Sequence, residues 1–314
     1  MSSDEGKGLW SSRSVGAVWQ HRFFYLLIRL GGRGAAYAFL HLVALYYVLL
    51  RPDQRRKGEF YLRRRFPKAQ GLALLRHGFR LNLGLGKSLI DRALIGILGP
   101  ESTQVTLQGG EELQALLAEG RGLILITAHV GCWQASLSAL DSLKAPVHLL
   151  MQREEGDVDR HYHEHRGEAA PFHIIDPRGD FGGALEMLGV LKRGEILSVM
   201  GDRLLGSERS AVTVDFLGAP VRLPFSAYKM ASVTGAPIGV LLSAKTGADR
   251  YELRLAKTLR VPGGLGRGGR AFADDARRFA ETLEKYTQQY PYQFFNFFDM
   301  WEQPLTANPP GDKE

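Results

Sequence analysis

Hydrophobic residues in the first third of the chain recur at helical spacing. Leu72, Leu75, Phe79 and Leu83 follow one another at intervals of three and four, and no alternating run interrupts residues 14–95. This spacing places the apolar side chains on one face of a helix. We therefore expect residues 14–95 to be helical throughout.

A different pattern begins near residue 111. The stretch 111–120 is typical of a short amphipathic helix, and 122–127, which is apolar as far as Thr127, is of the kind that forms a buried strand. Five further runs have strand character and lie at 146–151, 196–201, 212–216, 237–243 and 251–261. Helical stretches are expected near 131–143, 181–193, 224–234 and 270–289. Strands that alternate with helices predict the α/β class, here a mixed, mostly parallel sheet flanked by helices.

These patterns divide the chain into four parts. A helical region that we expect to associate with a membrane covers 14–95 and includes a basic flank, and the α/β domain covers 96–303. Residues 1–13 and 304–314 lack a periodic pattern and are expected to be disordered.

The most apolar segment of the helical region is residues 35–50, sixteen residues with His41 as the only strongly polar one. A helix that crosses a bilayer needs about 20 apolar residues, so this segment is at the lower limit for spanning and equally suits an interfacial helix. Residues 51–68 follow with eight basic and two acidic side chains, which favours an anionic membrane surface as partner. A buried core helix followed by a solvated basic helix is the alternative. The residues expected at the membrane are Tyr46, Tyr47, Arg55, Arg56, Arg63, Arg64 and Arg65.

Composition excludes several classes of protein. Hydrophobic residues make up 45% of the 314, enough for a substantial core, and the single cysteine, Cys132, excludes a disulfide framework or a multi-cysteine metal site. The net charge of +7 is concentrated beside the apolar segment, and no nucleic-acid-binding module is recognisable, so we expect no nucleic acid partner. His161, His163 and His165 alternate, but their polar surroundings are typical of a solvated helix or loop. We expect no metal centre and no cofactor.

The junction after the apolar run 122–127 holds the strongest candidate for chemistry. His129 follows the expected strand, and Gly131 permits a tight turn before the next expected helix. In open α/β sheets, ligands and catalytic groups lie at such strand ends. An imidazole there can act as a general base if a partner holds its second nitrogen, and Gln134 occupies a suitable position five residues on. A capping or structural histidine is the alternative.

Three blocks of sequence resemble a known family. Residues 127–134 resemble the H-x4-D/E motif of the lysophospholipid acyltransferase superfamily, in particular the branch of the late acyltransferases of lipid A biosynthesis. Residues 201–238 are similar to the central block of that branch, in which Asp-Arg or Asp-Gln after a strand precedes F-x-G-x-P and a T-G-A-P turn. Residues 290–301 resemble its aromatic terminus. The blocks occur in the same order, and the N-terminal hydrophobic helix with its basic flank also fits that branch. The resemblance thus extends over nearly the whole chain.

The resemblance implies transfer of a fatty acyl group from a thioester of acyl carrier protein or coenzyme A to a hydroxyl or amine. The acceptor would be a lipid or an aminoacyl group, and the site would lie at the cytoplasmic face of the inner membrane, with the chain peripheral or held by a single N-terminal anchor. His129 would be the general base and Gln134 its orienting partner. Arg203 suits a phosphate or carboxylate because its planar fork binds such groups with two hydrogen bonds. The residues implied at the substrate are Gly131, Trp133, Asp202, Arg203, Phe216 and Gly218.

The sequence departs from the family motif at Gln134, where the motif has a carboxylate. An amide oxygen can accept a hydrogen bond from the imidazole, but it cannot stabilise the imidazolium by charge. Three explanations are open: a less demanding reaction such as acylation of an amine, a carboxylate supplied from elsewhere in the fold, or a non-catalytic relative that binds a lipid or a carrier protein.

Overall fold

The computed structural model describes residues 18–133, 137–152, 172–179, 183–204, 211–266 and 268–301. The expected disordered ends, 1–13 and 304–314, and the three alternating histidines at 161–165 lie outside these ranges.

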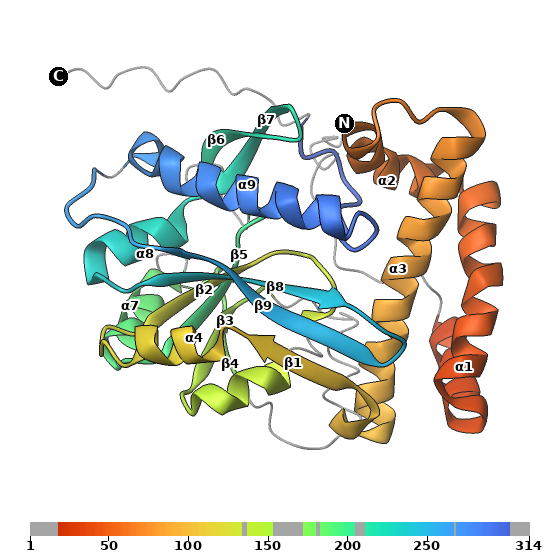
Figure 1. Ribbon diagram of the computed structural model, residues 1–314, viewed down its shortest axis with the longest axis horizontal. Helices are drawn as coiled ribbons and strands as arrows, with labels where there is room; N and C mark the ends of the chain where they lie inside the picture. The colour runs from red at the N-terminus through yellow and green to blue at the C-terminus, as the bar shows by residue number, and fades with distance from the viewer. Residues whose placement is uncertain are drawn as a thin grey trace, which may run out of the picture.

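Three helices precede the first strand: α1 (Val18–Leu50), α2 (Pro52–Arg65) and α3 (Gly71–Leu98). Figure 1 shows α1 as the outermost layer on one side, with α3 between it and the sheet. Pro52 is the first residue of α2, a position where its missing N–H is not needed and its fixed φ favours the helix. The basic segment that the sequence identified is therefore mostly helix, directly after the end of α1.

A seven-stranded sheet lies beside these helices. The spatial order of its strands is β1 (Gln104–Gln108), β9 (Arg250–Leu259), β8 (Ile238–Lys245), β2 (Leu123–Thr127), β5 (Ile196–Met200), β3 (Val147–Leu150) and β4 (His173–Ile175). All neighbours run parallel except β8 and β9. The predicted mixed, mostly parallel sheet flanked by helices is confirmed.

Helices cover both faces of this sheet (Figure 1). Along β2, Ile124 and Ile126 pack into the cluster formed with α7 (Ala184–Lys192), α8 (Ser226–Thr234) and α9 (Ala273–Gln289). Leu123 and Leu125 point to the opposite face and pack with α4 (Gly110–Leu117) and the short 3-10 segment Leu137–Leu143. Burial on both faces explains why this strand is a continuous apolar run instead of an alternating one.

All six strands expected from apolar runs are present, and three others were not expected. β1 and β4 lie at the two edges of the sheet, and β1 has a polar, half-exposed pattern. β7 (Ala219–Pro224) pairs only with β6 (Ala211–Phe216) in a separate hairpin, and it contains two prolines that weaken a strand signal. The described C-terminal part of the helical stretch expected at 131–143, Leu137–Leu143, is a 3-10 helix and not an α-helix.

Candidate active site

His129 lies two residues beyond the end of β2, at the carboxyl edge of the sheet. The turn that follows requires glycine: Gly131 has φ of 55°, and a Cβ at this position would lie 2.3 Å from the backbone oxygen of Ser243. Close contact with β8 therefore fixes the path of the chain after His129. Gln134 lies outside the described residues, so its position relative to the imidazole is a prediction from spacing alone.

Asp202 is the residue that the structure places against the His129 ring. Thr127 pairs with Met200 where β2 and β5 run side by side, and the same offset of 73 residues brings His129 opposite Asp202 just beyond the strand ends. Nδ1 of His129 lies 3.0 Å from each carboxylate oxygen, and the backbone N–H of His129 donates to Oδ2 at 3.3 Å. Because an ionised carboxylate only accepts hydrogen bonds, Nδ1 carries the proton, and Nε2 is the nitrogen with basic character.

The electrostatics of this pair favour an ionised Asp202. Its side chain is 1% exposed, whereas that of His129 is 25% exposed. Burial by itself raises the pKa of Asp202, but the charge and hydrogen bonds of His129, together with the charge of Arg203, bring that pKa below its ordinary value. A buried carboxylate beside a partly exposed imidazole is the arrangement that stabilises a developing imidazolium.

Arg203 follows Asp202 in the chain and is itself buried. Nη2 of its guanidinium donates to the carbonyl of Phe295 at 2.7 Å, and the guanidinium carbon lies 5.2 Å from the ring centre of Phe298. Burial lowers the pKa of Arg203 to about 10, and the charge of Asp202 opposes the shift. The side chain is therefore a cation at neutral pH, about 92% shielded from solvent, with Nε 3.9 Å from Oδ2 of Asp202.

The C-terminal aromatic segment, residues 290–301, holds the backbone of this site. Phe295 N–H donates to the carbonyl of His129 at 2.8 Å, and Gly131 N–H donates to the carbonyl of Gln293 at 3.0 Å. The Gln293 side chain in turn exchanges hydrogen bonds with the backbone of Lys245 in β8. Sequence reasoning missed these positioning roles, because most of the contacts use backbone atoms and leave no signal in residue type.

Comparison with known proteins agrees with the resemblance noted in the sequence. The family model described as bacterial lipid A biosynthesis acyltransferase matches residues 99–303. This range contains the whole sheet, both residues of the His129–Asp202 pair and the C-terminal aromatic segment.

The chain belongs to the bacterial lipid A biosynthesis acyltransferase family.

Membership in the lipid A biosynthesis acyltransferase family indicates acyltransferase activity in lipid biosynthesis, with an acyl donor and a lipid acceptor. The comparison with curated proteins gives no match. The matched range begins directly after α3, so the three N-terminal helices lie outside it.

The other residues that the resemblance placed at the substrate are spread over the domain of this acyltransferase-family chain. Gly131 forms the turn beside His129, whereas Trp133 is half-buried and packs against the α4 face of the sheet. Phe216 is 1% exposed and stacks on Trp301 with ring centres 6.0 Å apart, so it belongs to the core under the C-terminal aromatic segment. Gly218 occupies the β6–β7 turn with φ of 76°. Asp202 is thus the member of the set whose side chain contacts the imidazole, and Arg203 lies beside Asp202.

The residues expected at the membrane fall into two groups. Tyr46 is 42% exposed, and Arg56, Arg63 and Arg64 are exposed on α2. By contrast, Nε of Arg65 donates to the carbonyl of Thr287 at the end of α9, and Arg55 is half-buried against Glu59. Tyr47 is half-buried. The first group is the more exposed one, although Arg63 also pairs with Glu59 at 2.9 Å and the guanidinium of Arg64 lies over the ring of Trp301.

Other potential sites do not border the imidazole. Among the described residues, no group of three or more His, Cys, Asp or Glu side chains could hold a metal ion. A cavity of about 410 Å³ is lined by Arg121, Thr234 and Arg260, at the amino ends of β2 and β8, whereas His129 lies beyond the carboxyl end of β2. A second cavity, of about 350 Å³, lies between α4 and the segment 142–144. Neither contains a residue of the candidate active site.

Proposed function

We propose that the chain transfers a fatty acyl group from an acyl thioester to a hydroxyl or amine of a lipid or aminoacyl acceptor, with His129 as general base. We also propose that Asp202 supplies the charge that the family motif normally places at the position of Gln134. The observation that carries this proposal is the contact of Nδ1 of His129 with both oxygens of the buried Asp202. Of the three explanations for Gln134 that the sequence left open, this proposal takes the second, a carboxylate supplied from elsewhere in the fold.

The reaction follows from this geometry. Nε2 of His129 takes the proton from the acceptor O–H or N–H as the oxygen or nitrogen attacks the thioester carbonyl. A tetrahedral oxyanion forms, and Asp202 stabilises the imidazolium that has developed beside it. When the intermediate collapses, the C–S bond breaks, the acyl group stays on the acceptor, and the imidazolium returns its proton to the leaving thiolate. Acyl carrier protein and coenzyme A are both consistent donors for this step.

The site is proposed to work at the cytoplasmic face of the inner membrane, where acyl thioesters and lipid acceptors meet. A helix of the described residues, Phe23–Leu50, is long and apolar enough to cross a membrane by length and composition alone.

The test is release of free thiol by the purified full-length chain. Acyl-coenzyme A and acyl-carrier protein are supplied separately, each with a panel of lipid hydroxyl and aminoacyl acceptors, and thiol is measured with a chromogenic disulfide. We expect thiol release that depends on the acceptor, and a loss of about 10²- to 10⁴-fold in His129→Ala, the usual contribution of a general base.

His148→Ala is the matched control. His148 is also partly buried and paired with a carboxylate, with Nε2 lying 2.9 Å from Glu195 Oε2, but it is in β3, away from the candidate active site. Its substitution should leave thiol release unchanged. Equal activity of wild type and His129→Ala would refute the proposed mechanism, and inactivity of both with every donor and acceptor would favour the non-catalytic binding role.

A further inference from the structure

The apolar helix α1 is bent back on itself. Gly32 has φ of 62° and ψ of −160°, which is not helical, and it separates an arm Val18–Gly31 from an arm Arg33–Leu50. The ring of Phe39 lies 4.9 Å from that of Phe23 and 5.7 Å from that of Phe24, whereas residues 23 and 39 of a straight helix would be about 24 Å apart. The arms are therefore only about 21 Å and 27 Å long, short of the roughly 30 Å of a hydrocarbon core.

The second arm is attached to α3 along its length. Its buried residues recur at every fourth position (Ala36, Leu40, Ala44 and Val48), and the cluster that contains Ala36 and Leu40 also includes Ile90 and Leu94 of α3. α3 itself has exposed Arg76 and Arg80 side chains, which are costly to place in hydrocarbon. The second arm can therefore enter a bilayer only on the side turned away from α3.

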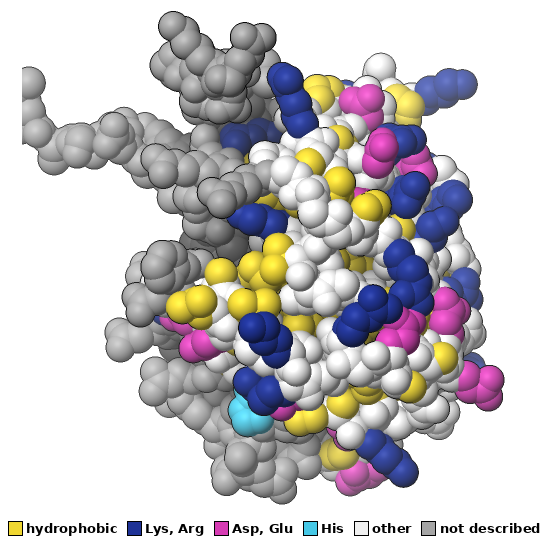
Figure 2. Space-filling model, turned by 90° about the vertical axis from the view of Figure 1, so that its left-hand side faces the viewer, with side chains coloured by type: hydrophobic (Ala, Val, Ile, Leu, Met, Phe, Trp, Pro, Cys, Tyr) yellow, Lys and Arg dark blue, Asp and Glu magenta, His cyan; other side chains and the backbone are white. Residues whose placement is uncertain are grey.

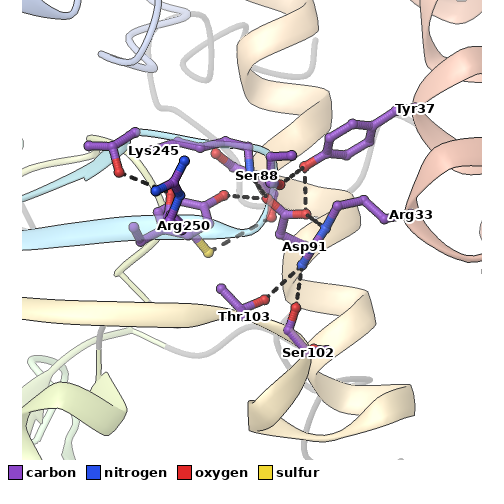
Figure 3. A network of polar contacts seen from close by, with 12 residues as sticks. Arg33, Tyr37, Ser88, Asp91, Ser102, Thr103, Lys245 and Arg250 are labelled. Atoms are coloured by element: carbon purple, nitrogen blue, oxygen red, sulfur yellow. Dashed lines mark hydrogen bonds and ion pairs between the residues drawn. The ribbon is translucent and has the colours of Figure 1, made fainter.

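A buried ionic network fixes the start of the second arm to the edge of the sheet (Figure 3). Asp91 of α3 is fully buried and accepts hydrogen bonds from Arg33 at 3.0 Å and from Tyr37 at 2.6 Å, both of α1. Its second oxygen accepts from Lys245 of β8 at 2.6 Å and from Tyr251 of β9 at 2.7 Å. A spanning orientation of α1 would either draw this charged cluster and the sheet edge into the membrane or break the network.

The outer side of α1 is apolar and exposed. Eight of the fourteen exposed large hydrophobic side chains among the described residues are on this helix. On the second arm, Leu42, Leu45, Leu49 and Leu50 are 46–68% exposed and repeat at the spacing of one helical face. The face of the molecule turned away from α1 has Lys and Arg side chains distributed among its apolar atoms (Figure 2), and only Leu185 and Val233 of the fourteen are on α7 and α8.

Basic side chains follow this apolar arm in the next helix, α2, which begins two residues after the end of α1. Arg56, Lys57, Arg63 and Arg64 of α2 are exposed, and Phe60 among them is 37% exposed. The opposite side of α2 is buried through Tyr61 and Leu62. Leucines that lead into cations around an aromatic residue match the boundary between acyl chains and anionic headgroups. An acidic carrier protein would match the cations but not the row of leucines.

We propose that α1 lies in the plane of one leaflet of an anionic bilayer without crossing it. The outward leucine face of its second arm contacts the acyl chains, and the basic side chains of α2 contact the headgroups. This inference deepens the membrane association proposed above and is independent of catalysis. It places the entire folded domain on one side of the membrane.

Depth measurement by spin labelling tests the orientation. Single cysteines replace Leu42, Leu45 and Leu49 in a full-length Cys132→Ser background, and the labelled proteins are bound to vesicles of phosphatidylcholine and phosphatidylglycerol. Relative accessibility to oxygen and to a soluble nickel complex gives the depth of each label. A helix in the plane predicts equal, shallow depths, whereas a helix that crosses the membrane changes depth by about 10 Å between positions 42 and 49. The second result would overturn the proposal.

Vesicle flotation tests the surface itself. Leu45→Gln/Leu49→Gln should reduce binding to these vesicles at least tenfold. Arg56→Gln/Arg63→Gln should reduce binding to the same vesicles but should not change binding to vesicles of phosphatidylcholine alone. The control is Leu185→Gln/Val233→Gln, which removes two apolar residues of α7 and α8 that are more exposed than Leu45 and Leu49, and it should bind as wild type does.

The His129→Ala variant should float normally, which separates failure of this inference from failure of the proposed reaction. Absence of vesicle binding by the wild type would overturn the proposal, and so would an equal loss of vesicle binding in the Leu185→Gln/Val233→Gln control. The proposal would also fail if the wild type bound acyl carrier protein instead of vesicles and Arg56→Gln/Arg63→Gln lost that binding.

Discussion

Replacing Asp202 by Asn is the sharpest perturbation of the proposed catalytic pair. The substitution keeps the size of the side chain but removes its charge, and it can place an NH₂ group against Nδ1 of His129, which lies 3.0 Å from both carboxylate oxygens. The variant therefore loses stabilisation of the imidazolium and also the hydrogen bond that selects the tautomer.

The size of the effect follows from Coulomb's law. Two unit charges about 4 Å apart attract by roughly 4 kcal/mol at an effective dielectric constant of about 20. At about 1.4 kcal/mol for each tenfold change in rate, this corresponds to a loss of about 10³-fold in kcat. The 1% exposure of the Asp202 side chain supports a value near this estimate instead of the smaller one expected for a surface pair.

The assay is steady-state thiol release with the best donor and acceptor pair, with kcat and KM determined separately. We expect kcat to fall by about three orders of magnitude with little change in KM, because imidazolium forms only during the reaction. Circular dichroism and thermal unfolding establish that the variant is folded. A folded Asp202→Asn variant with kcat within fivefold of wild type would refute the role of this carboxylate.

Three further predictions follow from the site and its supports. Gln134→Glu should leave turnover unchanged or raise it. In the Asp202→Asn background, the same substitution should restore part of the lost kcat if position 134 can reach the imidazole. A large loss of kcat in the single variant Gln134→Glu would show that the amide has a role of its own. The pKa of Asp202 is below its ordinary value in the folded chain, so the stability that its charge contributes is present above the pKa of the unfolded state and is lost as pH falls through the pKa of the folded state. In urea unfolding, the difference in stability between wild type and Asp202→Asn should therefore narrow as the pH is lowered. A difference that widens would contradict this. Asp91→Ala should lower the free energy of unfolding by about 3–5 kcal/mol, because it leaves the 11%-exposed Lys245 ammonium without its carboxylate. A decrease of less than about 1 kcal/mol would mean that the network does not hold α1 to the sheet.

The sequence predicted the central features of the fold because they depend on apolar periodicity. The run 122–127 is buried on both faces, and the end of this strand located His129 correctly at the sheet edge. Edge strands escaped prediction since they bury little: β1 has alternating half-exposed and exposed residues, and β4 is only three residues long.

The partner of His129 could not be predicted because it depends on strand order. Asp202 lies 73 positions away, and it meets the imidazole only because β5 is the neighbour of β2 in the sheet. The sequence marked Asp202 for substrate binding through its family block, but it contained no signal that β2 and β5 pair in this register. The turn at Gly32 coincides with a signal in the sequence, the three glycines at 31, 32 and 34, which the expectation of a continuous helical region did not use.

The most direct test of the catalytic claim follows the acyl group itself. A ¹³C-labelled acyl thioester is incubated with the acceptor and the full-length chain, and mass spectrometry measures the label in acceptor and in free fatty acid. The account predicts labelled acceptor with the wild type and with His148→Ala, and at least a hundredfold less with His129→Ala. Equal labelling of the acceptor by His129→Ala and wild type would contradict it.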